Sequence, residues 1–288
     1  MRPDMSRIVY VNGDYLPEED AKVSIFDRAF LMSDGIYEVT TVLDGKLVDF
    51  PGHLTRLHRS LGELDIPAPV SDEDLLAIHR ELVARNEVTE GMIYLQVTRG
   101  TQDRDFAWGP DLTPTLVLFT QAKSVADSPL ADRGARVIAI EDLRWGRRDI
   151  KTTQLLYPSI AKMAAKKAGC DDAWMVEDGL VTEGTSNNAW IVLADGTLVT
   201  RNLSNAILHG ITRAAVKEYA SAHQIKVEER PFTLDEAKSA AEAFFTSASA
   251  FVTPIVEIDG ATLGDGKPGP VAKRLREIYL AESRARAI

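Results

Sequence analysis

The chain has 288 residues, of which 45% are hydrophobic and 26% charged, and its formal net charge is −10. This composition is that of a folded globular protein and excludes a disordered chain and a disulfide-stapled miniprotein. The acidic balance argues against nucleic acid and against an anionic membrane surface as partners, because both attract basic proteins.

Cysteine use and apolar run length bear on the compartment. Cys170 is the single cysteine, so no internal disulfide can form, and a reducing compartment fits. The first residues contain no secretory signal, and the longest apolar runs are far shorter than the ~20 residues of a membrane span. We expect a cytoplasmic protein with no membrane partner.

Turn dipeptides beside β-branched and aromatic runs recur along the chain. Both residues of such a turn must tolerate positive φ, which asparagine, aspartate and glycine do. A β-hairpin is therefore predicted at each of Asn12-Gly13, Asp44-Gly45, Asp178-Gly179, Asp195-Gly196 and Asp259-Gly260.

Helical spacing of apolar residues appears between these hairpins. It predicts helices over residues 51–64, 71–83, 158–168, 211–223, 233–243 and 270–286. The second of them opens with a capping box made by Ser71 and Asp74. Runs of hairpin strands with helices between them predict an α+β fold rather than a doubly wound parallel sheet.

The polar, turn-rich stretch 121–134 is the best candidate for a linker. We therefore predict an N-terminal α+β domain over residues 1–120, a linker over 121–130 and a C-terminal α+β domain over 131–288.

Several common site motifs are absent. The sequence has no GxGxxG after a strand, no phosphate-binding P-loop, no HExxH, no CxxC and no GxSxG. Its five histidines do not have metal-ligand spacing. We predict no metal site.

Four polar segments stand where predicted elements end. Residues 144–153 contain three arginines and Lys151, and nearby positive charge can make a lysine nucleophilic. A solvent-exposed loop without a catalytic role would have the same composition. Residues 181–188 could form a simple turn or an anion cradle that also offers a carboxylate. Residues 209–213 open a helix, whose free N–H groups suit a phosphate. Residues 246–249 add hydroxyl groups, and no spacing rule connects the four.

These segments carry a resemblance when read together. Asp149-Ile150-Lys151, Thr182-Glu183-Gly184, residues 207–213 and Phe245-Thr246-Ser247 follow residues 34–38 (DGIYE) and 53–57 (HLTRL) in order. The chain resembles the class IV aminotransferases, the fold-type IV pyridoxal-phosphate enzymes, over residues 10–263, and is most similar to their D-amino-acid transaminase branch. The resemblance implies a two-domain α+β enzyme with the active site between the domains, and a homodimer.

The resemblance also implies the cofactor and its ligands. Lys151, in the C-terminal domain, would hold pyridoxal 5'-phosphate as a Schiff base and act as general base and acid. Glu183 would face the pyridine nitrogen and keep it protonated. The remaining implied cofactor ligands, at the phosphate, are Arg56, Gly210, Ile211, Thr212, Thr246 and Ser247.

Substrate recognition follows the family pattern only in part. Tyr37 and Arg104 match two members of the substrate-carboxylate trap of the D-amino-acid branch, but Phe106 stands where that branch has a histidine. The implied function is ping-pong transfer of an amino group from a D-amino acid to a 2-oxo acid. The alternatives are an (R)-amine or branched-chain amino-acid transaminase, a lyase such as aminodeoxychorismate lyase, or a non-catalytic binding protein.

Overall fold

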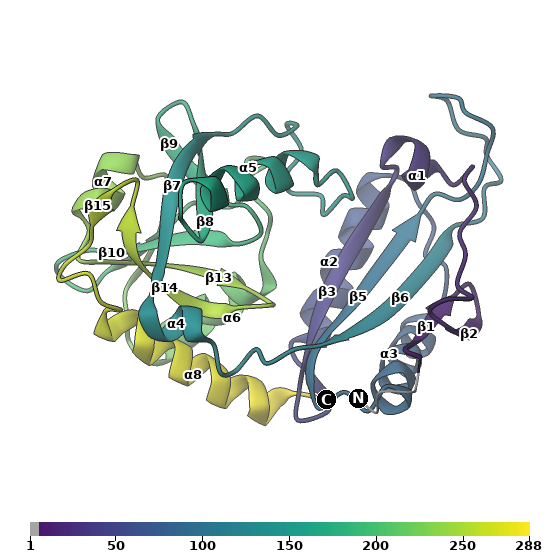
Figure 1. Ribbon diagram of the computed structural model, residues 1–288, viewed down its shortest axis with the longest axis horizontal. Coiled ribbons are helices and arrows are strands. Elements are labelled where there is room, and N and C mark those ends of the chain that lie inside the picture. Colours follow the sequence, from purple (N-terminus) through teal and green to yellow (C-terminus); the bar gives the residue numbers. More distant parts are fainter. Residues whose placement is uncertain (1–5) are drawn as a thin grey trace. The chain divides into compact units, whose positions relative to one another are not determined.

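The computed structural model describes residues 6–288, which fold as two compact units. Among these residues, unit 1 comprises 6–124, Ile150–Gln154 and Arg286–Ile288, and unit 2 comprises Val125–Asp149 and Leu155–Ala285 (Figure 1). The segment with Lys151 thus packs within unit 1, whereas the sequence assigns this lysine to the C-terminal domain. The domain limits at 1–120 and 131–288 stay a prediction.

Unit 1 is built on an antiparallel sheet in which strands far apart in the sequence lie side by side. The strands, in the order β2-β1-β6-β5-β3-β4, are β1 (Ile8–Val11), β2 (Asp14–Pro17), β3 (Gly35–Leu43), β4 (Lys46–Leu47), β5 (Glu90–Thr98) and β6 (Thr115–Ala122). The central pair, β3 with β5, is in register from Gly35↔Thr98 to Leu43↔Glu90. This long ladder gives the residues of β3 a fixed backbone.

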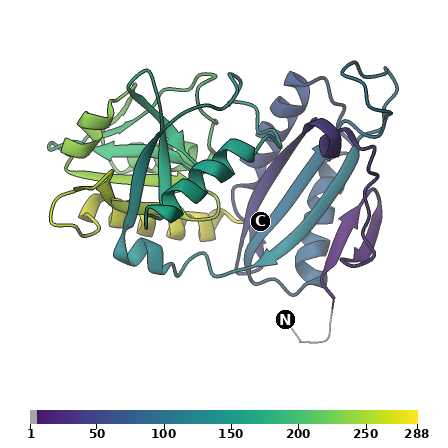
Figure 2. The same cartoon turned by 45° about the horizontal axis from the view of Figure 1, so that its top comes forward.

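Helices α2 (Phe50–Glu63) and α3 (Asp72–Arg85) cover one face of this sheet, as Figure 2 shows. They bury Leu57, Leu61 and Leu82 in the core of unit 1. Both helices were predicted, and Ser71 caps α3 by accepting a hydrogen bond from the Asp74 N–H at 3.1 Å. The short helix α1 (Arg28–Met32) was not predicted, because five residues are too few for a periodic pattern.

Unit 2 contains a mixed sheet in the order β12-β11-β10-β13-β14-β7-β8-β9, with β15 paired to β14. Its strands are β7 (Ala135–Glu141), β8 (Asp172–Glu177), β9 (Leu180–Gly184), β10 (Asn188–Val192), β11 (Leu198–Thr200), β12 (Val227–Glu229), β13 (Glu242–Ser247), β14 (Phe251–Ile258) and β15 (Ala261–Thr262). The pairs β11–β12, β14–β7 and β7–β8 are parallel, and the rest are antiparallel. The predicted α+β class is confirmed.

The helices of unit 2 are α4 (Pro129–Arg133), α5 (Leu156–Lys167), α6 (Ile211–Ala222), α7 (Leu234–Ser239) and α8 (Pro270–Arg286). Helix α7 is shorter than the predicted helix over 233–243. Its C-terminal part is strand instead, because Glu242 and Ala243 pair with β10 and the ladder outweighs local helix propensity. Helix α4 overlaps the end of the predicted linker.

All five predicted hairpins are confirmed. In four of them both turn residues have positive φ, as at Asp44 (52°) and Gly45 (74°). The exception is Asp195-Gly196, where only the glycine has positive φ and the Asp195 side chain accepts a hydrogen bond from the Thr197 N–H at 3.0 Å.

Candidate active site

The backbone of Lys151 is held against the first residues of β3. The Tyr37 N–H donates to the Lys151 carbonyl at 2.9 Å, and the Thr153 N–H donates to the Gly35 carbonyl at 3.0 Å. Ile36 and Thr152 form an isolated bridge between them. This pairing explains why the lysine segment belongs to unit 1.

The Lys151 side chain lies on an aromatic stack. Its Nζ is 4.1 Å from the centroid of the Tyr37 ring, which stacks on Tyr94, which in turn stacks on Phe119. Within residues 6–288, Nζ forms no ion pair and no hydrogen bond. The amine is therefore positioned by a ring face rather than by a carboxylate.

Arg56, an implied phosphate ligand, is buried in unit 1 beside Glu38. Its Nε and Nη2 donate to the two Glu38 carboxylate oxygens, both at 2.7 Å, and His53 Nδ1 lies 2.8 Å from Oε2. Burial acts to raise the pKa of Glu38, but the charge and hydrogen bonds of Arg56 and His53 outweigh it and hold that pKa well below its usual range. The bidentate pair fixes the plane of the guanidinium.

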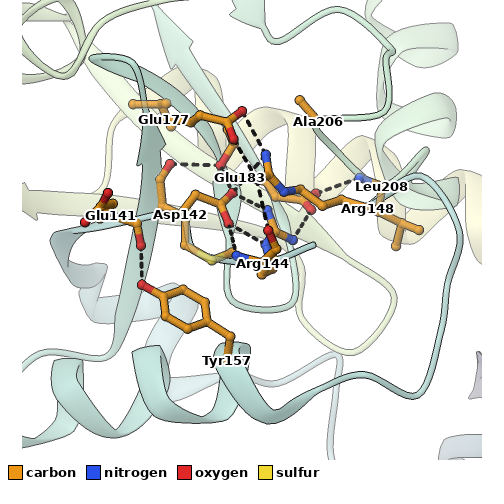
Figure 3. A network of polar contacts seen from close by, with 12 residues as sticks. Glu141, Asp142, Arg144, Arg148, Tyr157, Glu177, Glu183, Ala206 and Leu208 are labelled. Carbon is orange, nitrogen blue, oxygen red and sulfur yellow. Dashed lines mark hydrogen bonds and ion pairs between the residues drawn. The ribbon is translucent and has the colours of Figure 1, made fainter. Parts of the chain in front are cut away.

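Glu183, on β9 of unit 2, is also buried and accepts three hydrogen bonds (Figure 3). Arg144 Nη1 donates to Oε1 at 2.6 Å, while Asn188 Nδ2 and the Leu208 N–H donate to Oε2 at 2.9 and 3.1 Å. Burial raises the pKa of Glu183, and the arginine only partly opposes it. The carboxylate is thus fixed in orientation while its charge is poorly compensated.

Arg144 is itself held by a second buried carboxylate, Asp142 (Figure 3). Its Nε and Nη2 donate to Oδ1 and Oδ2 of Asp142 at 2.9 and 2.7 Å, and Thr182 Oγ1 donates to Oδ2 at 2.7 Å. Arg148 pairs with Glu177 at 2.7 Å and lies 3.6 Å from Asp142. Sequence reasoning singled out this arginine-rich segment but missed that Arg144 contacts Glu183, because a spacing of 39 residues carries no local signal.

The start of α6 closely follows Leu208 in the chain, and Leu208 contacts Glu183. The N-cap of the helix, Gly210, has no side-chain cap, so the first N–H groups of the helix lack intrahelical partners. A Cβ at Gly210 would come within 2.0 Å of the Asn188 Oδ1, so only glycine fits this approach. Asn188 Nδ2 also donates to the Leu208 carbonyl at 3.0 Å and so ties the α6 start to Glu183.

Thr246 and Ser247 end β13, and the register of the sheet places Thr246 directly opposite Asn188 on β10. Trp190 Nε1 donates to Thr246 Oγ1 at 3.0 Å. Unit 2 therefore gathers Glu183, the N-terminus of α6 and the end of β13 around one residue, Asn188. The sequence placed all three motifs but had no means of showing that Asn188 joins them.

These residues fit pyridoxal 5'-phosphate. The α6 N-terminus, with the hydroxyls of Thr212 and Thr246, suits a phosphate dianion, and a buried carboxylate suits a protonated pyridine nitrogen. An amine without an acidic partner suits a covalent bond to an aldehyde.

The predicted substrate ligand Arg104 lies on the loop between β5 and β6 and is exposed. Its guanidinium forms no hydrogen bond or ion pair with any described residue, and its Cζ is 5.5 Å from the centroid of the Phe106 ring. Phe106 is 79% exposed. The other predicted substrate ligand, Tyr37, lies beneath Lys151, and no hydrogen bond within residues 6–288 joins it to Arg104.

The chain matches the profile of the family "Amino-transferase class IV" over residues 35–258, and it belongs to this family. It is thus a pyridoxal-phosphate-dependent aminotransferase of fold type IV. It is 37% identical over 270 residues to the D-alanine aminotransferase of Staphylococcus aureus strain N315, covering 93% of this chain and 95% of that one. Identity to the Staphylococcus haemolyticus D-alanine aminotransferase is 39% over 272 residues, with the same coverage.

Solved structures with the same fold include branched-chain aminotransferases. The one from T.th. with pyridoxamine 5'-phosphate has a TM-score of 0.90 at 28% identity, covering 98% of this chain and 95% of that one. The one from Thermoproteus uzoniensis with norvaline has a TM-score of 0.88 at 27% identity, covering 98% and 96%. Among the helices of residues 6–288, none has both the length and the apolar character needed to span a membrane.

Proposed function

We propose that this aminotransferase moves an amino group from a D-amino acid to a 2-oxo acid by a ping-pong mechanism. The observation that carries the donor class is the exposed, unpartnered guanidinium of Arg104 among the described residues, because such a group binds a carboxylate bidentately. The D configuration is supported by the D-alanine aminotransferases to which the chain is similar over 93% of its length.

The roles of the cofactor-binding residues follow from their surroundings. When bound, pyridoxal phosphate supplies an electron sink for negative charge on the donor Cα. Lys151 would bind the cofactor covalently, and its Nζ would be the base that removes the proton from the donor Cα and the acid that returns one in the reverse half-reaction. Glu183 holds a proton on the pyridine nitrogen.

The phosphate would be held by two kinds of group. The N–H groups at the start of α6, Ile211 and Thr212 after Gly210, contribute the helix dipole, and Thr246 and Ser247 contribute hydroxyls. Arg56 would supply the positive charge.

A second candidate is an (R)-amine transaminase, which the exposed Phe106 favours because an apolar ring replaces a hydrogen-bond donor. A panel of D- and L-amino acids and (R)- and (S)-amines, with pyruvate and 2-oxoglutarate as acceptors, decides the donor. Preference for D-amino acids over the matching (R)-amines supports the proposal, and the reverse preference overturns it. Branched-chain L-amino acids as best donors would identify the branched-chain type, and pyruvate release without an acceptor would identify the lyase.

A homodimer is part of the proposal. In unit 1, Phe30 of α1 is 73% exposed, and in unit 2 Leu156, Ile160 and Met163 leave an apolar row of α5 in solvent. Such patches are typical of protein interfaces. Light scattering after size exclusion should give twice the 31.6 kDa chain mass.

The single cysteine supports a cytoplasmic location, which cell fractionation tests.

A further inference from the structure

Two buried arginines lie beneath the loop that carries Arg104 and Phe106, here called the donor loop (residues 101–110). Arg28 begins α1 and Arg99 follows β5, and both are nearly inaccessible to solvent. The Nε atoms of both donate to the same oxygen of Asp34, Oδ2, at 2.7 and 2.8 Å. None of these three residues belongs to the predicted cofactor or substrate ligands.

The Arg28 side chain binds the backbone of the donor loop. Its Nη1 donates to the Asp105 carbonyl at 2.7 Å and its Nη2 to the Phe106 carbonyl at 3.3 Å. These are the carbonyls of the two residues that directly follow Arg104. The guanidinium therefore fixes the part of the loop that presents both the cation and the aromatic ring.

Arg99 contacts a side chain of the loop, that of Trp108. Its Cζ is 3.8 Å from the centroid of the Trp108 ring, a cation–π contact, and its Nη2 donates to the Leu64 carbonyl at 2.7 Å. The ring thus covers a guanidinium that Asp34 and backbone carbonyls hold from other sides.

The donor loop also closes on itself. Gln102 Nε2 donates to the Ala107 carbonyl at 2.9 Å, and the Gly109 N–H donates to Gln102 Oε1 at 2.8 Å. The Ala107 N–H donates to Asp105 Oδ1 at 3.1 Å. The loop is a compact unit that the two arginines attach to the fold, and at its start the Gln102 N–H also donates to the Phe26 carbonyl at 3.1 Å.

The charges explain why this attachment is firm. Two guanidinium groups share one carboxylate, so the loop carbonyls and the Trp108 ring supply much of the remaining negative potential. If the loop opened, buried N–H donors would lose their acceptors, which is unfavourable. Arg104, by contrast, has no hydrogen-bond or ion-pair partner among residues 6–288 that it must leave when a substrate arrives.

We propose that Arg28, Arg99 and Trp108 are positioning residues that clamp the donor loop and so give the enzyme its preference for amino donors that carry a carboxylate. This inference rests on the proposed function, because it takes Arg104 as the carboxylate ligand. A guanidinium on a pre-arranged loop binds its ligand without losing the free energy needed to order the loop.

The test measures two quantities in Arg28→Met, Trp108→Leu and Trp108→Phe variants. The first is hydrogen exchange of the amides of residues 102–109 in protein without substrate. The second is the ratio of kcat/KM for a D-amino acid to kcat/KM for an (R)-amine of similar size without a carboxylate. Arg85→Met is the matched control, since Arg85 pairs with Glu81 on α3 and makes no contact with the loop.

We expect Arg28→Met and Trp108→Leu to speed exchange in the loop and to lower the donor ratio about tenfold, a change of about 1.4 kcal/mol. Trp108→Phe keeps a ring face and should stay near wild type, as should the control. Unchanged exchange in Arg28→Met and Trp108→Leu, or equal losses for both donors, would overturn the clamp. If the wild type does not accept D-amino acids, the proposed function and the specificity role fail together, while the exchange data still decide whether the loop is clamped.

Discussion

Glu38 and Glu183 are two buried glutamates, each paired with an arginine, and yet their pKa values move in opposite directions. Burial acts to raise both, but the pKa of Glu38 ends well below its usual value and that of Glu183 ends above it. The difference lies in how each arginine is shared. Arg56 gives two hydrogen bonds to Glu38, and His53 adds a third contact.

Arg144 gives Glu183 only one hydrogen bond and directs two others to Asp142, which also adds a nearby negative charge. The geometry therefore fully compensates one carboxylate and leaves the other short of positive charge. A buried carboxylate that is short of positive charge is stabilised most by a further cation, such as a protonated pyridine ring. The glutamate with a structural role and the glutamate with a proposed functional role therefore differ in their counter-charges and not in their burial.

The functional half of this comparison requires the cofactor, which Lys151 is predicted to hold. Lys151→Ala should abolish the visible absorbance of the covalently attached cofactor and lower turnover by at least about a thousandfold, since both anchor and base are lost. Absorbance spectra and kcat check this. Cofactor still trapped by borohydride at the usual stoichiometry would place the attachment on another lysine.

The structural half is tested at Glu38. Glu38→Gln leaves Arg56 buried without its counter-charge, and breaking a buried pair in this way lowers the free energy of unfolding by about 3–5 kcal/mol. Urea unfolding measures the change. Glu81→Gln, in the exposed pair with Arg85, is the control and should change it by less than about 1 kcal/mol. Equal effects of the two variants would contradict the structural role of Glu38.

Glu183→Gln should give the complementary result. A neutral amide cannot hold a proton on the pyridine nitrogen, and loss of one buried charge pair costs about 2–5 kcal/mol. As a barrier, this is a decrease in rate of about tens- to thousands-fold. Cofactor content and single-turnover rates measure it, and the free energy of unfolding should not fall. Normal turnover at wild-type cofactor content would remove this role from Glu183.

Arg104 extends the comparison to a cation with no carboxylate partner among the described residues. Arg104→Ala should raise KM for D-amino acids about ten- to a hundredfold more than KM for (R)-amines, because a charge-assisted pair contributes about 1.5–3 kcal/mol. Phe106→His restores a donor and should move the ratio the other way. If KM rises equally for D-amino acids and for (R)-amines, Arg104 affects only the shape of the loop.

The smallest expected effect is a pH dependence of opposite sign at the two glutamates. Stability from ionised Glu38 is present above its ordinary pKa of 4.5 and is lost as pH falls through its lower folded value. Because the folded pKa of Glu183 is raised, its contribution is present below 4.5 and is lost as pH rises through the folded value.

Unfolding at a series of pH values checks both signs. The stability difference between wild type and Glu38→Gln should shrink below pH 4.5, whereas Glu183→Gln should gain in stability relative to the wild type as pH rises above 4.5. Parallel curves for the two variants would contradict the difference in counter-charge.

Local patterns predicted the elements whose stability is decided within a few residues. The hairpins at Asp44-Gly45 and Asp178-Gly179 have the positive φ values that the dipeptides require. Helix α8 spans the predicted residues 270–286 because its apolar spacing is uninterrupted. The family motifs likewise indicated Lys151, Glu183 and the α6 start, since each is a short run of letters.

Patterns failed where a distant partner decided the outcome. Glu242 and Ala243 read as helix but form strand β13, because β10 offers a ladder. Arg28, Arg99 and Trp108 carried no signal, since their contacts join α1, the end of β5 and the donor loop. Asn188 is one of several polar residues in its segment, and nothing in the sequence distinguishes it from the others.

By itself, the sequence determined the α+β class, the family and the chemical identity of the groups that act, because these depend on residue type and short-range order. Only the tertiary structure decided the charge environment of those groups: which carboxylate receives a whole arginine, which shares one, and which cation has no carboxylate partner among residues 6–288. The physical reason is that electrostatic free energy depends on burial and on distances of a few ångströms between atoms. Residues 39 positions apart, such as Arg144 and Glu183, reach such distances only when the chain is folded.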